Sequence, residues 1–191
     1  MQIAVQACEP GTELGSGAFV DDDLVLTSAH TLRGAREIIV RRGEQSVPAE
    51  VVGFDPDVDL AYLRADLDPH HPLTVDSSGV EAGDRGVAWV VRQGVAMPLP
   101  VTVSRPVRIN TEDIYVEGSV TRPGFELEAD IRPGDSGGPV MVDGKVIGVV
   151  FARSRAEGLR SYAIDPVRGG DRIDAQLASG VLGDVDLARC P

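Results

Sequence analysis

Short apolar runs separated by turn residues recur along the chain about every eight to twelve positions. Glycine and proline, present in 22 and 13 copies, interrupt these runs and leave little room for long helices. This pattern is typical of an all-β protein. The predicted strands are 17–20, 24–28, 37–41, 46–55 and 60–64 in the first half, and 85–91, 98–109, 113–116, 125–130, 140–142, 146–152 and 161–164 in the second.

Two segments have a helical pattern, and one polar segment divides the strands. Residues 29–33 suggest a single helical turn, and 166–177 suggest a helix that begins at Pro166. The polar segment 76–84 separates the two strand sets, so we expect two small β-barrels or sandwiches. Asp143-Gly144 predicts a tight hairpin, because glycine tolerates the positive φ of such turns. The expected division is an N-terminal segment 1–11, a first barrel 12–75, a linker 76–84, a second barrel 85–165 and a C-terminal helix and tail 166–191.

Charge and hydropathy exclude several classes of protein. Against 30 acidic residues there are 18 basic ones, and the net charge of -12 makes nucleic acid a poor partner. The longest apolar runs are far shorter than the roughly 18 residues that a spanning helix needs. No charged start followed by an apolar run opens the chain, which predicts either a cytosolic protein or an excised domain.

The most informative segment is the string GDSGGP at 134–139. Three glycines around Ser136 allow successive backbone N–H groups to surround a small anion while the hydroxyl stays exposed. The alternative is an ordinary glycine-rich turn, but chance rarely supplies the whole string. Ser136 is therefore a candidate nucleophile.

A serine nucleophile needs a base and a group that orients the base. His30 follows an apolar strand, whereas His70 and His71 lie between prolines and are interpreted as solvated turn residues. Asp59 is the best orienting acid, because apolar residues follow it directly; its neighbour Asp57 is the alternative.

The order of these residues along the chain excludes two classes of hydrolase. No histidine follows Ser136, which excludes α/β-hydrolases, and subtilisins need more helices than this chain offers. The order His30, Asp59, Ser136 is that of chymotrypsin.

Three blocks carry a family resemblance: TSAH at 27–30, DVDLAYL at 57–63 and GDSGGPV at 134–140. The chain resembles the chymotrypsin-like (trypsin-fold) serine proteases over about 12–165. It is most similar to the periplasmic domain of actinobacterial membrane-anchored acid-resistance proteases. The resemblance implies an all-β fold of two antiparallel six-stranded β-barrels with a short C-terminal helix, and a periplasmic or extracellular location.

The resemblance also implies roles for individual residues. His30, Asp59 and Ser136 would form the catalytic triad, and the backbone N–H groups of Gly134 and Ser136 the oxyanion hole. Asp130, six residues before Ser136, would select Arg or Lys side chains, unless it forms a structural ion pair with a nearby arginine such as Arg132.

The two cysteines lie near opposite ends of the chain. Their position allows one disulfide between Cys8 and Cys190 or two free thiols, and the resemblance implies the disulfide. It further implies protein or peptide substrates and a role in envelope or acid stress. No metal is expected, because no ligand spacing supports a site built from His30, His70 and nearby acids. We also expect no cofactor, no membrane insertion of this domain, and a monomer. The alternative function is a catalytically silent trypsin-fold module used for binding or sensing.

Overall fold

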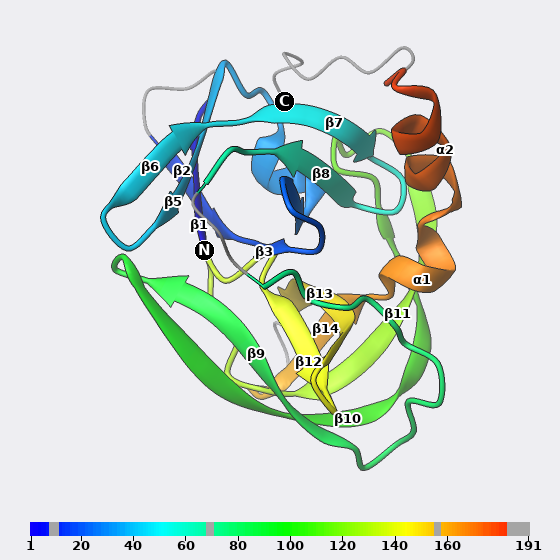
Figure 1. Cartoon of the computed structure of the whole chain (residues 1–191). Helices are drawn as coiled ribbons and strands as arrows, with labels where there is room; N and C mark the ends of the chain where they lie inside the picture. The colour runs from blue at the N-terminus through cyan, green and yellow to red at the C-terminus, as the bar shows by residue number, and fades with distance from the viewer. Residues whose placement is uncertain (8–11, 68–70, 155–157, 183–191) are drawn as a thin grey trace.

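The computed structural model describes residues 1–7, 12–67, 71–154 and 158–182. The chain forms two bodies of β-strands, followed by two short helices that lie along one side of the molecule (Figure 1). No helix in the described ranges is long and apolar enough to cross a membrane.

The second half of the chain forms a closed barrel of six antiparallel strands, in the order β10-β11-β14-β13-β12-β9. Its buried core includes Val103, Phe125, Leu127 and Val150. At the predicted hairpin, Asp143 and Gly144 both have positive φ, of 49° and 76°. The prediction of a six-stranded barrel is therefore confirmed for this half. The strands are β9 (Arg85–Arg92), β10 (Val95–Glu112), β11 (Ser119–Glu128), β12 (Pro139–Val142), β13 (Lys145–Arg153) and β14 (Arg160–Ile164).

The first half differs from the predicted single six-stranded barrel, because it contains two four-stranded sheets, β2-β1-β5-β6 and β3-β4-β8-β7. One residue, Gly17, separates β2 from β3, and one residue, Ala49, separates β6 from β7. At these two residues the chain passes directly from the first sheet to the second. There is little room for a side chain at the first of these residues, because a Cβ on Gly17 would lie 2.9 Å from Ile3 Cδ1. The strands are β1 (Gln2–Gln6), β2 (Thr12–Ser16), β3 (Ala18–Phe19), β4 (Leu24–Thr27), β5 (Glu37–Arg42), β6 (Gln45–Pro48), β7 (Glu50–Asp55) and β8 (Leu60–Arg64).

Two further expectations about strands are wrong. The segment expected to precede the barrel contains β1, which pairs with both β2 and β5 and contributes Ile3 and Val5 to the core. Residues 113–116 are a turn and not a strand, because the Asp113 carboxylate accepts hydrogen bonds from the N–H groups of Tyr115 and Glu117.

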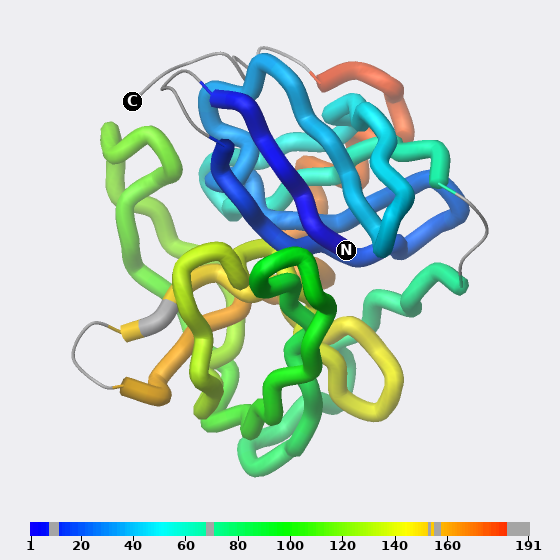
Figure 2. The backbone as a smooth tube through the Cα atoms, turned by 90° about the vertical axis from the view of Figure 1, so that its left-hand side faces the viewer, coloured from blue at the N-terminus to red at the C-terminus, as the bar shows by residue number. Residues whose placement is uncertain are grey.

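This turn ends the long β10–β11 hairpin, which reaches across to the first half of the chain (Figure 2). The buried Ile114 packs into the first core, and its carbonyl accepts a hydrogen bond of 2.7 Å from Arg33. The second barrel therefore contributes a side chain to the core of its neighbour.

The expected helix is present as two pieces, α1 (Pro166–Gly169) and α2 (Asp171–Ser179). The buried Asp165 caps α1 by accepting from the N–H groups of Val167 and Arg168. Adjacent glycines, Gly169 and Gly170, lie where the helix breaks, in keeping with the low helix propensity of glycine. α2 packs on β7 and buries Ile173.

Candidate active site

His30 and Asp59 are joined by two hydrogen bonds. His30 lies in a single 3-10 turn, η1 (Ala29–Leu32), directly after β4, and Asp59 directly precedes β8, which pairs with β4. The Asp59 carboxylate accepts from the His30 backbone N–H and lies beside its ring Nδ1, both at 2.7 Å. The imidazole is thus held with Nδ1 toward Asp59, while 32% of its side chain stays exposed.

The backbone at Asp59 presents the carboxylate from an unusual conformation. Its φ is 67°, a left-handed value that is uncommon for residues other than glycine. Its N–H donates to the Asp55 carbonyl at 2.9 Å, and its own carbonyl accepts from Ala29 N–H at 3.3 Å. Asp59 is fully buried, whereas the side chain of Asp57 is 57% exposed and pairs with Arg172. Asp59 rather than Asp57 therefore occupies the position beside His30.

Two opposing effects set the pKa of His30. Burial lowers the pKa of the imidazole, and the charge of Asp59 and its hydrogen bond raise it. The positive charges of Arg122 and Arg33 lower it further. The net result is a His30 pKa above the ordinary value of 6.5, so the carboxylate dominates.

Ser136 lies in the turn between β11 and β12, which packs against the end of β2 and the segment before His30. Its carbonyl accepts a hydrogen bond of 2.7 Å from Ser16 N–H. A Cβ on Gly137 would lie 2.2 Å from the Ser16 carbonyl and 3.2 Å from the backbone nitrogen of Ser28. In the part of the chain that the structure describes, no hydrogen bond joins the half-buried Ser136 hydroxyl to His30.

Two backbone N–H groups of this turn differ from their neighbours, because they have no hydrogen-bond partner among the described residues. The N–H groups of Asp135, Gly137 and Gly138 donate to carbonyls at 2.9 to 3.1 Å. Those of Gly134 and Ser136 have no partner among residues 1–7, 12–67, 71–154 and 158–182. With Gly134 at φ 94°, the turn leaves two donors available to an anion beside the serine.

Asp130 forms an ion pair with Arg132, with the oxygen and nitrogen 2.5 Å apart and 48% of the Asp130 side chain exposed. This ion pair is the one that the sequence offered as the alternative to a role of Asp130 in substrate selection. Selection of Arg or Lys by Asp130 stays a prediction.

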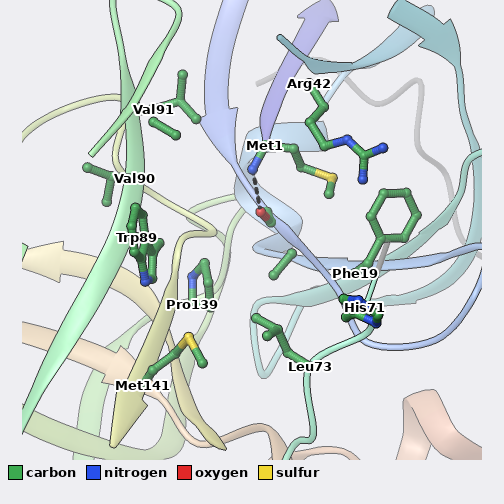
Figure 3. A pocket seen from close by; sticks show the side chains of 13 residues that line it. Met1, Phe19, Arg42, His71, Leu73, Trp89, Val90, Val91, Pro139 and Met141 are labelled. Carbon is green, nitrogen blue, oxygen red and sulfur yellow. Dashed lines mark hydrogen bonds between the residues drawn. The ribbon is translucent and has the colours of Figure 1, made fainter. Parts of the chain in front are cut away.

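Other predicted residues lie outside the site or outside the description. Cys8, Cys190 and His70 lie outside the described residues, so the disulfide stays a prediction. His71 is exposed and, together with Phe19 and Trp89, lines a mostly apolar hollow of about 370 Å³ between the two halves (Figure 3). Within the described ranges, no three His, Cys, Asp or Glu side chains are grouped to hold a metal ion.

Two arginines at the site were not predicted from the sequence. Arg92 pairs with the buried Asp135, next to Ser136, and Arg122 lies beside Asp59. Arg92 lies at the end of β9 and Arg122 within β11, and neither belongs to a recognisable motif.

Known proteins resemble this chain in sequence and in fold. The profile of the trypsin-like peptidase domain matches residues 15–149. The serine protease Rv3671c of Mycobacterium tuberculosis is 32% identical over 174 residues, which cover 90% of this chain and 42% of that protein. A probable periplasmic serine endoprotease, DegP-like, of Halomonas elongata is 34% identical over 192 residues, covering 92% of this chain and 38% of that protein.

This chain thus spans less than half the length of these two relatives. The crystal structure of the Rv3671c protease from M. tuberculosis in its active form superimposes with a TM-score of 0.86 at 29% identity, covering 99% of this chain and 84% of that one. On the match of the family profile and of these relatives, the chain belongs to the trypsin-like peptidase family.

Proposed function

We propose that this chain is a serine endopeptidase domain that hydrolyses peptide bonds through His30, Asp59 and Ser136. The observation that carries the proposal is the pair of 2.7 Å contacts between Asp59 and His30, beside a glycine-rich turn that bears Ser136. A carboxylate at Nδ1 leaves Nε2 as the nitrogen that accepts a proton.

The reaction takes two steps. The Ser136 hydroxyl oxygen attacks the peptide carbonyl carbon while His30 Nε2 takes its proton, and the C–N bond then breaks as His30 returns that proton to the leaving amine. Water, activated by His30 in the same way, attacks the acyl-enzyme ester and releases the acid and the free serine. Asp59 holds the imidazole orientation and stabilises the imidazolium in both steps.

The unpaired N–H groups of Gly134 and Ser136 are the proposed oxyanion donors. They would bind the oxygen that becomes negative when the carbonyl carbon turns tetrahedral. Loss of one such donor costs about 3 kcal/mol of transition-state stabilisation in other serine proteases.

Protein or peptide substrates and an extracytoplasmic location are the proposed context. The Halomonas relative is described as a periplasmic endoprotease, and the resemblance to acid-resistance proteases supports a role in envelope or acid stress. A Cys8–Cys190 disulfide, which we also propose, would suit an oxidising compartment.

A fluorophosphonate probe tests this proposal directly, because it reacts with a serine only when the triad and oxyanion hole are assembled. Intact mass should show one adduct on the native chain, located at Ser136 by peptide mapping. No adduct should form on S136A or on urea-unfolded chain. If the folded native chain is not labelled by the probe and does not cleave casein, catalysis is refuted and the catalytically silent binding module is favoured. Repeating the labelling with reductant tests whether a disulfide supports the active form.

A further inference from the structure

A buried arginine of the second half lies directly behind the His30–Asp59 pair. Arg122, on β11, is 1% exposed and faces the turn that precedes β8. Its Nε donates to the Asp57 carbonyl at 2.7 Å and its Nη2 to the Pro56 carbonyl at 3.3 Å. Its Nη1 lies 4.0 Å from Asp59 Oδ2, the oxygen that contacts His30 Nδ1.

One aromatic ring contacts both basic side chains that lie beside Asp59. The guanidinium carbon of Arg122 lies 5.0 Å from the centre of the Phe151 ring, in the range of a cation–π contact. The same ring meets the His30 imidazole edge to face, with centroids 6.1 Å apart at 77°. Phe151 therefore packs against both the guanidinium and the imidazole that lie beside the carboxylate.

Burying a guanidinium costs free energy of desolvation. A buried arginine is therefore expected where nearby groups need its hydrogen-bond donors and its positive charge. Two carbonyls of the turn need donors, and whenever His30 is neutral the fully buried Asp59 carboxylate needs another cation beside it. Among the described residues, only His30 and Arg122 bring a basic nitrogen within 4.0 Å of Asp59. Arg122 is thus the permanent positive charge at this carboxylate.

We propose that Arg122 is a positioning residue for catalysis, which fixes the turn that carries Asp59 and places a permanent positive charge behind the His30–Asp59 pair. This rests on the proposed function of His30 as the general base. Arg122 reaches the turn from the second barrel, so it also makes the geometry of the pair depend on the docking of the two halves.

The charges around Arg122 and His30 determine in which direction the pKa of His30 should change when Arg122 is replaced. Arg122 faces four carboxylates, those of Asp55, Asp57, Asp59 and Asp113. Burial lowers the pKa of its guanidinium and these carboxylates raise it; arginine stays protonated at any working pH.

At His30, Asp59 raises the pKa of the imidazole, and Arg122 and Arg33 lower it. Removing the charge of Arg122 should therefore raise the pKa of His30.

Two variants separate the charge from the packing. R122Q is neutral but keeps an N–H donor for the turn, and R122K keeps the charge. The readout is the titration of the His30 imidazole by NMR, with the signal assigned by its absence in H30Q, together with the pH profile of kcat/KM. In R122Q we expect the His30 pKa to rise by about one unit and kcat to fall about tenfold with little change in KM. R122K should keep the His30 pKa within about 0.3 units of the unmodified chain.

R85Q is the matched control, because Arg85 is an exposed arginine at the start of β9. The proposal is overturned if the His30 pKa of R122Q equals that of R85Q, or if R122K shifts as far as R122Q. A loss of activity in R122Q without a shift in pKa would also overturn it, since packing alone explains that result. The NMR titration needs no turnover, so an inactive unmodified chain would refute the proposed function and leave this test intact.

Discussion

Arg92 holds the carboxylate of Asp135 with two hydrogen bonds, of 2.9 Å from Nε and 2.6 Å from Nη2. Asp135 is fully buried, directly precedes Ser136 and also accepts from the Arg132 backbone N–H at 2.7 Å. The same guanidinium donates to the Asp130 carbonyl. A single side chain therefore fixes the loop that leads into the proposed nucleophile and oxyanion donors.

We expect R92M to destabilise the protein and to reduce activity. Removing one partner leaves the buried Asp135 charge uncompensated, which costs about 3 kcal/mol. The loop that positions the Gly134 and Ser136 N–H groups should loosen as well. Urea unfolding and hydrolysis of a peptide ester measure the two effects.

R64M is the matched control, since Arg64 and Asp23 form an ion pair in which both side chains are 54% exposed. Such surface pairs contribute about 0 to 1 kcal/mol. Equal unfolding midpoints of R92M and R64M would contradict the role given to Arg92.

The pKa of His30 predicts the pH dependence of activity. The imidazole must be neutral to act as a base, and its pKa lies above 6.5, so the acid limb of kcat/KM should have its midpoint above pH 6.5. In D59N that midpoint should fall, because the group that raises the pKa is lost. Turnover of D59N should drop about 10⁴-fold, as for the same change in trypsin. A D59N midpoint at or above that of the unmodified chain would contradict this explanation.

The same shift predicts a stability difference of defined sign. A raised pKa means that the folded state stabilises protonated His30, so this contribution is fully present below pH 6.5 and is lost as pH rises through the folded pKa. The free energy of unfolding of the unmodified chain should exceed that of H30Q by more at pH 5.5 than at pH 8.5. Urea titrations at the two values decide the matter, and a larger difference at pH 8.5 would reverse the sign.

Gly137 and Gly144 allow steric crowding to be separated from backbone strain. Both have positive φ, of 83° and 76°, but a Cβ on Gly137 would lie 2.2 Å from the Ser16 carbonyl, whereas a Cβ on Gly144 meets nothing within 4 Å. We expect G144A to cost about 1 kcal/mol and to remain active. G137A should cost at least about 3 kcal/mol and abolish labelling of Ser136. Similar stability of both variants would show that the turn can move away from Ser16.

Because Asp130 is already in an ion pair, we expect it to contribute little to substrate specificity. Its carboxylate is already paired with Arg132, so a substrate cation would compete for an occupied partner. In D130A the ratio of kcat/KM for Arg over Leu at the cleaved position should change less than about threefold, roughly 0.6 kcal/mol. A loss of Arg preference greater than about tenfold would restore Asp130 as the selecting residue.

The sequence was informative where local chemistry determines structure. The hairpin at Asp143-Gly144 and the six strands of the second barrel follow from turn residues and apolar alternation. His30 and Asp59 were found because each adjoins an apolar strand in a specific chain order, and the structure places them in contact.

Features that depend on contacts between distant segments were not predictable from the sequence. Arg122 is 65 residues from the Asp57 carbonyl that it binds, and nothing in its own strand points to that partner. Likewise, Ile114 lies at a hairpin tip whose burial depends on the neighbouring core. The bend at Gly17 depends on the side chains that pack against it, such as Ile3.

The packing of α2 on β7 has a consequence for solubility. β7 is the outermost strand of its sheet, and a free edge of this kind can recruit a strand from another molecule. The side-chain amide of Gln176 accepts from the Phe54 N–H at 2.8 Å and donates to the Phe54 carbonyl at 3.1 Å, in the manner of a neighbouring strand. The Gln176 side chain of α2 thereby occupies backbone groups of the edge strand that another strand could otherwise bind. A chain cut before α2 would expose this edge, and we expect it to be prone to intermolecular β-pairing and aggregation.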